Sequence, residues 1–594
     1  MRKLLTGNEA IARGAYEAGV LMAAAYPGTP STEIMENLSQ YEEVLCEWST
    51  NEKVALEVAA GASIAGARSL VSMKHVGLNV AADPLFTIAY EGVNGGLVVV
   101  TADEPGMHSS QNEQDNRLYA PHAKVALVEP SDSQECKDFI KEAFRVSEEF
   151  DTVVLFRVTT RVCHSKSLVE LVDRQEVGVR DYRKDPTKYI MVPANSKRKH
   201  IEMEEERIPR LRDYSNKSPL NRIEWNDDRK VGVITNGMAY LNAREALGDR
   251  VSYLKIGFSW PLPDELIREF AAGVDKLYVI EENEPHMEQF IKAMGIECTG
   301  KELFSPCGEI SPDIIREKLL GETKTDLYSL DTVVPSRPPA LCAGCPHRGI
   351  FYALSKHKNK INVINDIGCY TLGASAPLGM GDVVICMGAG ITAAVGFNKA
   401  NKLAGRDKKV FGFVGDSTFF HSGITGLIDA VYNKSDIAMV ILDNRTTAMT
   451  GHQDNPGTGK SVIGEDAPEV DIVAVVRAVG IREENLRVID PYDMEANKEA
   501  VAAALKATEP FVIITKQPCA LIKDVQLARR DLRCQVNQDL CRKCKTCLRI
   551  GCPAISMVGN IVSIDESQCN GCQVCLQVCP FSAIEFFGKE VTND

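Results

Sequence analysis

Two runs of cysteines lie close together in residues 541–594. The second run has the spacing C-x2-C-x2-C-x3-C-P, and the first is one residue longer before its last cysteine. Such runs are typical of chains that hold two [4Fe–4S] clusters, where the fourth cysteine of each run binds the other run's cluster. This exchange predicts two ligand sets: Cys541, Cys544, Cys547 and Cys579 for one cluster, and Cys569, Cys572, Cys575 and Cys552 for the other.

Zinc sites or a disulfide knot are the alternatives for these cysteines. Zinc needs four ligands and has no use for two C-x2-C-x2-C runs that each end in Cys-Pro. Disulfides are typical of small secreted chains, whereas this chain has 594 residues, 19 cysteines and a polar N-terminus. We therefore expect a ferredoxin-like module that moves single electrons, in the reducing cytoplasm of an organism that tolerates little oxygen. The longer first run predicts a bulged loop and leaves the completeness of one cluster open.

A second group of polar residues follows two predicted strands. Asp416 comes after the strand pattern 409–414, and Asn444 comes after the strand pattern 437–442. Open α/β sheets bind ligands at the carboxyl ends of their strands, and a carboxylate with amide and backbone oxygens suits Mg²⁺ on a phosphate. The pattern resembles the thiamine diphosphate motif Gly-Asp-Gly…Asn. By that resemblance the metal ligands are Asp416, Asn444 and the Thr446 backbone, and the diphosphate lies on Gly415 and Ser417, where Ser replaces the second Gly.

The elements that must position these groups alternate between helix and strand. Residues 7–19 and 51–68 have helical patterns, 97–101 is a buried strand, and strands recur near 231–235, 251–255 and 277–280. This alternation predicts an α/β protein with parallel sheets. The expected domains are 1–165 (pyrimidine-binding type for thiamine diphosphate), 166–225 (charged linker or excursion), 226–330 (α/β, like the transketolase C-terminal domain), 331–529 (diphosphate-binding type) and 530–594 (α+β, ferredoxin-like with two clusters).

The composition excludes two kinds of partner. The formal net charge is −14, which disfavours binding to nucleic acid. No stretch of about 18 apolar residues occurs, so we expect no membrane span. An anionic cofactor therefore needs local help from a metal ion or from helix N-termini.

Several longer strings resemble the 2-oxoacid:ferredoxin oxidoreductase family over essentially the whole chain. They are residues 26–32, 51–67, 341–348 and 366–370, and the strings 106–117, 345–348 and 442–452 look most like the α subunits of its indolepyruvate (arylpyruvate) branch. The resemblance implies that Thr29 contacts the oxoacid. It also implies that Glu52 is the carboxylate that binds the aminopyrimidine ring of thiamine and promotes formation of the reactive C2 ylid. Glu47 and Glu57 are alternatives for that carboxylate.

The resemblance further implies a third [4Fe–4S] cluster beside the thiamine. Family members hold it with counterparts of Cys342, Cys345 and Cys369 and one later cysteine. Cys519 is the best fourth ligand in this sequence, and Cys534 is a less favoured one. The alternative is a structural turn at the first two cysteines and a buried thiol at Cys519.

Together these features predict a catalytic subunit for the ferredoxin- and CoA-dependent oxidative decarboxylation of indolepyruvate and other arylpyruvates to arylacetyl-CoA and CO2. Pyruvate-specific relatives place an arginine just after the strand that corresponds to 97–101. Here Ala102-Asp103-Glu104-Pro105 follow, so a larger oxoacid is the better candidate. Three histidines are candidates to line the substrate pocket: His75, His108 and His122. We assign a catalytic role to none of them.

The predicted partners are ferredoxin and a second subunit. The family's small γ-type domain has no counterpart in this chain, which implies a separate β subunit and an α2β2 heteromer. The alternatives for function are the same chemistry on pyruvate or a branched-chain oxoacid, a non-oxidative thiamine-dependent decarboxylase, and a non-catalytic electron-transfer subunit.

Overall fold

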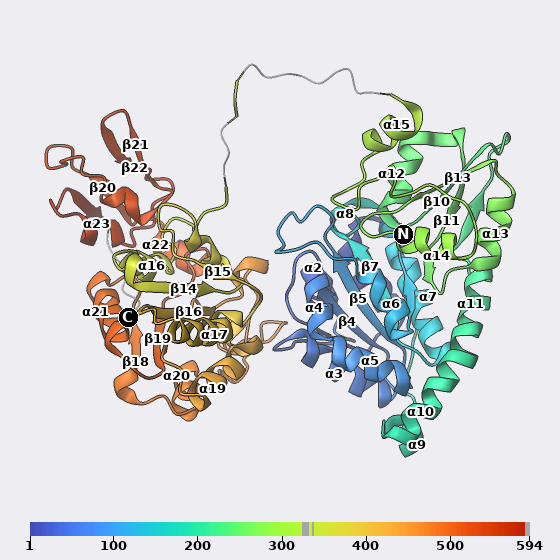
Figure 1. Ribbon diagram of the computed structural model, residues 1–594, viewed down its shortest axis with the longest axis horizontal. Helices are drawn as coiled ribbons and strands as arrows, with labels where there is room; N and C mark the ends of the chain where they lie inside the picture. The colour runs from blue at the N-terminus through green and yellow to red at the C-terminus, as the bar shows by residue number, and fades with distance from the viewer. Residues whose placement is uncertain (323–331, 335–337, 589–594) are drawn as a thin grey trace. The chain divides into compact units, whose positions relative to one another are not determined.

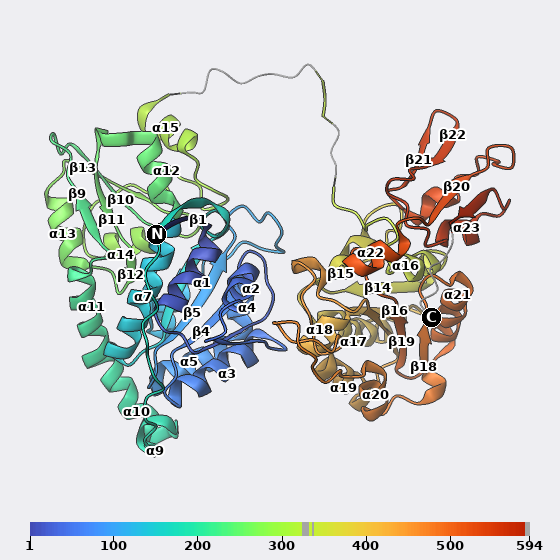
Figure 2. The same cartoon turned by 180° about the vertical axis from the view of Figure 1, so that it is seen from behind.

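The computed structural model describes residues 1–322, 332–334 and 338–588. The chain divides into two compact units, 1–331 and 332–594, which are described separately. Both combine helices with mainly parallel sheets (Figures 1 and 2), which confirms the predicted α/β fold class. No helix in the described part of the chain has the length and apolar character needed to cross a membrane.

Unit 1 is built on a seven-stranded sheet with the strand order β12-β6-β7-β5-β4-β2-β3, in which only β12 is antiparallel to its neighbour. A second sheet has the order β13-β10-β11-β9, and β1 pairs with β8. The strands are β1 Arg2–Thr6, β2 Met22–Ala25, β3 Leu45–Trp48, β4 Ser69–Lys74, β5 Leu97–Asp103, β6 Ala126–Val128, β7 Val154–Thr159, β8 Lys166–Glu170, β9 Arg222–Glu224, β10 Val231–Thr235, β11 Ser252–Lys255, β12 Phe258–Trp260 and β13 Lys276–Ile280.

Most helices of unit 1 lie between these strands in the sequence, and the last two follow β13. Predicted helix 7–19 is α1, which begins in a capping box at Thr6, and predicted helix 51–68 is α3, which Asn51 caps. The helices are α1 Gly7–Glu17, α2 Thr32–Leu38, α3 Glu52–Ile64, α4 His75–Val80, α5 Ala82–Glu91, α6 Tyr119–Ala123, α7 Ser133–Phe150, α8 Thr160–His164, α9 Pro186–Tyr189, α10 Pro193–Glu202, α11 Ile208–Lys217, α12 Gly237–Leu247, α13 Asp264–Ala272, α14 His286–Ala293 and α15 Pro312–Leu320.

A buried ion-pair network joins the two sheets of unit 1. Arg117, at the end of the string 106–117, is fully buried and donates to Asp115 and to Glu281 Oε2 at 2.7 Å. Arg157 of β7 donates to Asp103 at 2.8 Å and to Asn283 at 3.0 Å. Buried charges persist only when they are paired in this way. Asp115 and Arg117 of the string 106–117 therefore stabilise the fold of unit 1.

The charged segment 166–225, predicted to be a linker or an excursion, makes hydrogen bonds to the rest of unit 1. Its first residues form β8, which pairs with β1, and Arg174 donates to the carbonyls of Tyr16 and Val20. Further on, Arg207 is buried and donates to the Ala89 carbonyl at 2.6 Å. Several of its cations thus bind carbonyls of unit 1 instead of lying in solvent, which composition alone does not reveal.

Unit 2 contains a six-stranded parallel sheet with the order β15-β14-β16-β17-β19-β18. The predicted strands 409–414 and 437–442 are its central neighbours β16 and β17. Its strands are β14 Ile361–Asn365, β15 Val383–Val384, β16 Lys409–Gly415, β17 Ile437–Asp443, β18 Leu486–Ile489 and β19 Phe511–Lys516. Its helices are α16 Arg348–Ser355, α17 Ala389–Leu403, α18 Asp416–Thr418, α19 Ile424–Tyr432, α20 Ile472–Ala478, α21 Met494–Lys506 and α22 Lys523–Arg529.

The C-terminal module of unit 2 consists of two strand pairs and a short helix. β20 (Arg533–Val536) pairs with β23 (Ile584–Phe587), and β21 (Ile555–Val558) pairs with β22 (Ile561–Ile564). α23 (Val574–Val578) precedes β23. The apolar residues of this module share one core with those around α16 and α21, so the module packs directly on the domain with the parallel sheet.

Candidate active site and cluster sites

Asp416 and Asn444 lie at the carboxyl ends of two adjacent parallel strands, β16 and β17. Asp416 is 3% exposed, and its carboxylate accepts hydrogen bonds from the backbone N–H groups of Ser417 at 2.8 Å and Thr446 at 3.2 Å. Burial, and then the nearby carboxylate of Asp443, raise the pKa of Asp416 to about 7. A buried carboxylate of this kind is costly to ionise without a cation.

The side-chain oxygen of Asn444 lies 3.2 Å from Asp416 Oδ1 and 2.8 Å from the carbonyl oxygen of Thr446. A turn of the amide by 180° would instead place its nitrogen there as a donor to both oxygens. Adjacent ligands of octahedral Mg²⁺ lie about 3 Å apart when each metal–oxygen bond is about 2.1 Å. The spacing of these oxygens therefore fits a magnesium ion.

Gly415 and Ser417 flank this oxygen cluster. A Cβ at residue 415 would lie 2.9 Å from the ring of Tyr370, whose hydroxyl binds Asp366. Asp366 in turn accepts from Gly388 N at 2.8 Å, just before α17. In the sequence, Asp366 stands out only as a member of the string 366–370. Nothing near it in the sequence predicts its buried contact with Gly388.

Replacing Asp416 with asparagine should weaken magnesium-dependent binding of thiamine diphosphate. Loss of the charged ligand should weaken binding by roughly 2–3 kcal/mol, or about 30- to 150-fold. Titration of the purified protein with the cofactor in the presence of Mg²⁺ measures this change. Wild-type affinity in the variant would show that the diphosphate is held elsewhere. Iron content, which depends on other residues, should not change.

The four cysteines proposed for the third cluster come together from three separate loops. Cys342 and Cys345 precede α16, Cys369 follows β14, and Cys519 follows β19. Burial raises the pKa of Cys369 to about 11, and the neighbouring thiols of Cys519 and Cys342 add to the shift. Burial likewise raises the pKa of Cys345 to about 12, with contributions from Cys342 and Cys369. The four thiols therefore share one neighbourhood, which fits the donor set of a [4Fe–4S] cluster.

This cysteine group adjoins the oxygen cluster. The backbone N–H of Cys519 donates to the main-chain carbonyl of Asn444 at 2.9 Å. The Cys519 sulfur also lies 3.7 Å from His452 Nε2, in the string 442–452. A residue of the cysteine group is thus hydrogen-bonded directly to a residue of the oxygen cluster.

The eight cysteines of the two runs in the C-terminal module line two small hollows. One hollow is lined by Cys541, Cys544, Cys547 and Cys579, and the other by Cys552, Cys569, Cys572 and Cys575. The crossover of the fourth cysteine, expected from the spacing, therefore appears in the geometry. The longer first run ends in a short 3-10 helix, closed by Gly551 at φ 67°.

Cys534 lies at the second of these hollows, which the sequence did not indicate. It is 1% exposed on β20, and its backbone N–H donates to the sulfur of Cys569 at 3.3 Å. Its place in the sequence makes it a less favoured candidate ligand of the third cluster. Its neighbours instead make it a fifth cysteine beside the set that contains Cys569.

Arg348 connects the two parts of unit 2. The guanidinium is buried and donates to the carbonyls of Ile550 at 2.8 Å, Leu341 at 2.7 Å and Cys342 at 2.8 Å. It also lines the hollow that contains Cys572. One side chain thus joins the loop of the third cysteine group to the C-terminal module.

Replacing Arg348 with methionine should lower the free energy of unfolding of unit 2 by about 2–6 kcal/mol, because the buried carbonyls of Ile550 and Leu341 lose their donor at a cost of about 1–3 kcal/mol each. The matched control is Arg529→Met, since Arg529 makes a cation–π contact with Tyr492, with 4.8 Å between guanidinium carbon and ring centre. The control should change stability by about 1 kcal/mol or less. Guanidinium unfolding followed by cluster absorbance compares the two. Equal midpoints would rule out the bridging role.

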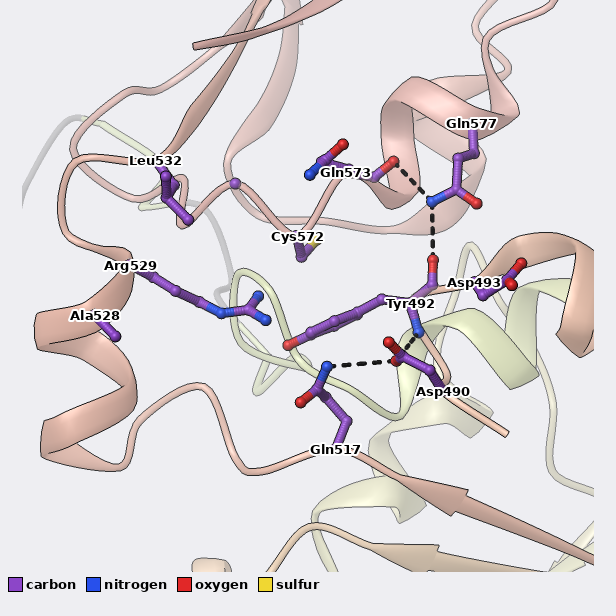
Figure 3. A pocket seen from close by; sticks show the side chains of 11 residues that line it. Asp490, Tyr492, Asp493, Gln517, Ala528, Arg529, Leu532, Cys572, Gln573 and Gln577 are labelled. Atoms are coloured by element: carbon purple, nitrogen blue, oxygen red, sulfur yellow. Dashed lines mark hydrogen bonds between the residues drawn. The ribbon is translucent and has the colours of Figure 1, made fainter. Parts of the chain in front are cut away.

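Tyr492 also lies between the third cysteine group and the C-terminal module. Its hydroxyl donates to the Gly344 carbonyl at 2.6 Å, and Cys572 and Cys345 are among the groups that raise its pKa after burial itself. Figure 3 shows the Tyr492 ring below Cys572, with the Arg529 guanidinium facing it, in a pocket of about 690 Å³. The loop 342–345 and the loop around Cys572 are therefore near neighbours.

In unit 1, Glu52 is the first residue of α3 and is 5% exposed. Gly77 of α4 gives its side chain room, because a Cβ at residue 77 would lie 2.6 Å from Glu52 Cγ. The two alternative carboxylates have other partners: Glu57 is exposed and pairs with Lys53, and Glu47 accepts from Ser49 at 2.9 Å. Burial at a helix start thus distinguishes Glu52.

Thr29 lies in a loop after β2 that hydrogen bonds hold in place. Gly28 N donates to the hydroxyl of Thr32 at 3.0 Å, and Asn8 donates to the Pro30 carbonyl at 2.7 Å. Thr29 itself is half-buried. The loop therefore presents the Thr29 side chain from a fixed backbone.

Lys74 is a cation near this loop that sequence reasoning missed. It ends β4, and a Cβ at Gly28 would lie 3.0 Å from Lys74 Cβ. Its ammonium lies 3.3 Å from Glu104 Oε2, and burial lowers its pKa against the opposing effect of Glu104. The region that lacks the arginine of pyruvate-specific relatives thus contains a partly buried lysine.

The three histidines have different surroundings. His75 is fully buried, and burial lowers its pKa to about 4, so its ring is neutral at neutral pH. His108 is exposed and lies 3.4 Å from Glu309. His122 packs edge-on against Phe86, with 4.8 Å between ring centres. None of these contacts indicates a catalytic role.

Three family models match the chain. They are pyruvate flavodoxin/ferredoxin oxidoreductase, thiamine diP-binding (residues 13–218), the C-terminal TPP binding domain of thiamine pyrophosphate enzymes (357–515), and the 4Fe-4S binding domain (562–585). The first model spans most of the charged segment 166–225, in agreement with its packing on unit 1. The last contains the second cysteine run.

Curated relatives match almost the full length. The Indolepyruvate oxidoreductase subunit IorA of Archaeoglobus fulgidus is 42% identical, covering 98% of this chain and 97% of its own. The subunit of the same name from Methanothermobacter thermautotrophicus is 40% identical with the same coverage. The 2-oxoglutarate synthase subunit KorA of Methanothermobacter marburgensis is 25% identical over 53% of this chain and 98% of its own.

Proposed function

The chain belongs to the family of indolepyruvate oxidoreductase IorA subunits, and from this premise we propose that it catalyses the CoA-dependent oxidative decarboxylation of arylpyruvates. It is an enzyme subunit of the 2-oxoacid:ferredoxin oxidoreductase type, with thiamine diphosphate-binding domains and a 4Fe–4S domain. It works with a partner subunit and with ferredoxin. The proposed products from indolepyruvate are indoleacetyl-CoA, CO2 and two reduced ferredoxins.

Asp416, Asn444 and the Thr446 carbonyl would hold Mg²⁺, and Gly415 and Ser417 would contact the diphosphate. The convergence of three oxygens beside buried Asp416 supports this assignment. Thiamine diphosphate supplies a carbon nucleophile and an electron sink when it is bound. Glu52 would hydrogen-bond the aminopyrimidine ring and hold its proton, since a buried carboxylate at the start of α3 suits that task.

The single observation that carries the redox assignment is the hydrogen bond between Cys519 N and the Asn444 carbonyl. It places a residue of the third cysteine group against the residue proposed to bind magnesium. From that group, Arg348 and Tyr492 lead to the loop of Cys572. We infer three [4Fe–4S] clusters in sequence, with the two in the C-terminal module nearest to the acceptor.

For the substrate, we propose that Thr29 and Lys74 bind the oxoacid carboxylate. Lys74 supplies a cation from β4 where pyruvate-specific relatives use an arginine from another position. The names of the relatives support an arylpyruvate. A separate β subunit in an α2β2 heteromer completes the proposed enzyme.

The test is reduction of ferredoxin or methyl viologen by the purified complex with its partner subunit. Indolepyruvate, phenylpyruvate, pyruvate and 2-oxoisovalerate are compared with and without CoA. We expect CoA-dependent dye reduction that is fastest with the aryl substrates. Preference for pyruvate would overturn the substrate assignment, and aldehyde formation without dye reduction would overturn the redox reaction.

A further inference from the structure

Three cations surround the most exposed cysteine of the C-terminal module. Arg542, Lys543 and Lys545 flank Cys544 in the sequence, and all four line the hollow formed by the first ligand set. All four side chains are exposed, whereas Cys575 in the other set is buried. The first ligand set therefore contains the more exposed cysteine of the two sets. We name Arg542, Lys543 and Lys545 the basic rim.

In the described part of the chain, the acidic groups near the basic rim do not form ion pairs with it. Among residues 1–322, 332–334 and 338–588, none of its three side chains forms an ion pair within 4.0 Å, in contrast to nearby Arg533, which lies 3.6 Å from Glu566. The nearest acidic residue before it in the sequence is Asp539, which is also exposed. The chain as a whole has a formal charge of −14. A local group of unpaired cations in an acidic protein creates a field that attracts an anionic partner.

We propose that the basic rim is the docking surface for the ferredoxin acceptor, which would present carboxylates around its own cluster. The inference rests on the proposed function and adds the place where electrons leave. One electron passes from the cluster held by the first ligand set, which is oxidised, to the ferredoxin cluster, which is reduced. No bond or proton is exchanged, and two ferredoxins dock in turn for each oxoacid oxidised.

Charge complementarity sets the expected kinetics. Attraction between a basic rim and an acidic carrier increases the association rate by about 10- to 1,000-fold at low salt and loses its effect as ions screen it. Methyl viologen is a small dication, which the basic rim does not attract, so reversing the rim's charge should not slow its reduction. The ratio of ferredoxin to dye reduction therefore isolates the docking step.

The test variant is Lys543→Glu/Lys545→Glu in the complete complex, and the matched control is Lys399→Glu/Lys402→Glu on α17. Both pairs are exposed, and both exchanges change the net charge equally. The donor is the dithionite-reduced complex, so the result does not depend on any oxoacid. We expect the rim variant to reduce an acidic [4Fe–4S] ferredoxin about 10- to 100-fold more slowly at low salt, while its dye reduction is not slowed and the control variant keeps the wild-type ferredoxin rate.

Lys543 and Lys545 have left-handed backbone conformations with φ of 56° and 63°, so iron is measured in each variant. If iron is lost, Arg542→Glu, whose φ is not positive, replaces the pair as the test. Carbodiimide coupling of ferredoxin carboxylates to lysine amines gives a readout without turnover, with Lys543 or Lys545 expected in the cross-linked peptide. Equal ferredoxin rates in the rim and control variants, or cross-links only at other lysines, would overturn the proposal.

Discussion

Replacing Glu52 with glutamine should lower oxoacid turnover by roughly 10²- to 10⁴-fold, the range that a positioned proton-transfer group contributes. The amide keeps the size of the side chain but cannot hold a proton between itself and the aminopyrimidine ring. Glu52 is buried against Gly77 at the start of α3, far in sequence from every cysteine ligand. Iron content and cofactor affinity should therefore stay at wild-type values while kcat falls.

The matched control for this variant is Glu57→Gln on the same helix. Glu57 is exposed and pairs with Lys53, so its loss should change turnover little and stability by about 0.5 kcal/mol or less. Steady-state dye reduction with indolepyruvate and CoA measures both variants. Full activity in Glu52→Gln, or a comparable loss in Glu57→Gln, would remove the assignment of Glu52.

The second large effect is expected from Cys519→Ala. Loss of one thiolate should release the third cluster, so that iron falls from about twelve to about eight atoms per chain, at four per cluster. Oxoacid-driven ferredoxin reduction should stop, because Cys519 lies against Asn444 at the start of the electron path. The two clusters of the C-terminal module should remain, since their hollows do not include Cys519.

Cys298→Ala is the control for a buried thiol in unit 1, and it should leave iron unchanged. Iron and sulfide analysis with EPR of the reduced protein distinguishes the outcomes. About eight irons in wild type and in Cys519→Ala alike would mean that residues 342, 345, 369 and 519 are structural thiols, and would remove the third cluster from the proposal.

The cysteine pattern was the most informative part of the sequence. Spacing alone grouped Cys552 with Cys569, and the structure places both at one hollow. Spacing is informative here because a [4Fe–4S] cluster needs three closely spaced thiolates, which one short loop can supply. Asp416 and Asn444 were found for a similar reason, since adjacent parallel strands end at the same edge of the sheet.

Long-range contacts explain what the sequence did not indicate. Arg348 is a buried donor because Ile550, more than 200 residues away, offers it a carbonyl. Lys74 and Cys534 likewise acquire their neighbours only through sheet packing. The charged composition of segment 166–225 predicts a linker or an excursion, because composition cannot reveal that its cations bind backbone carbonyls.

The central claim is that electrons released from an oxoacid at the thiamine site enter iron–sulfur clusters of this same chain. The most direct measurement is anaerobic addition of indolepyruvate and CoA to the purified complex without any acceptor, followed by visible absorbance and EPR. The account predicts bleaching of cluster absorbance and the appearance of reduced [4Fe–4S] signals in wild type, and neither in Glu52→Gln. Unchanged clusters together with CO2 and aldehyde formation in wild type would contradict it.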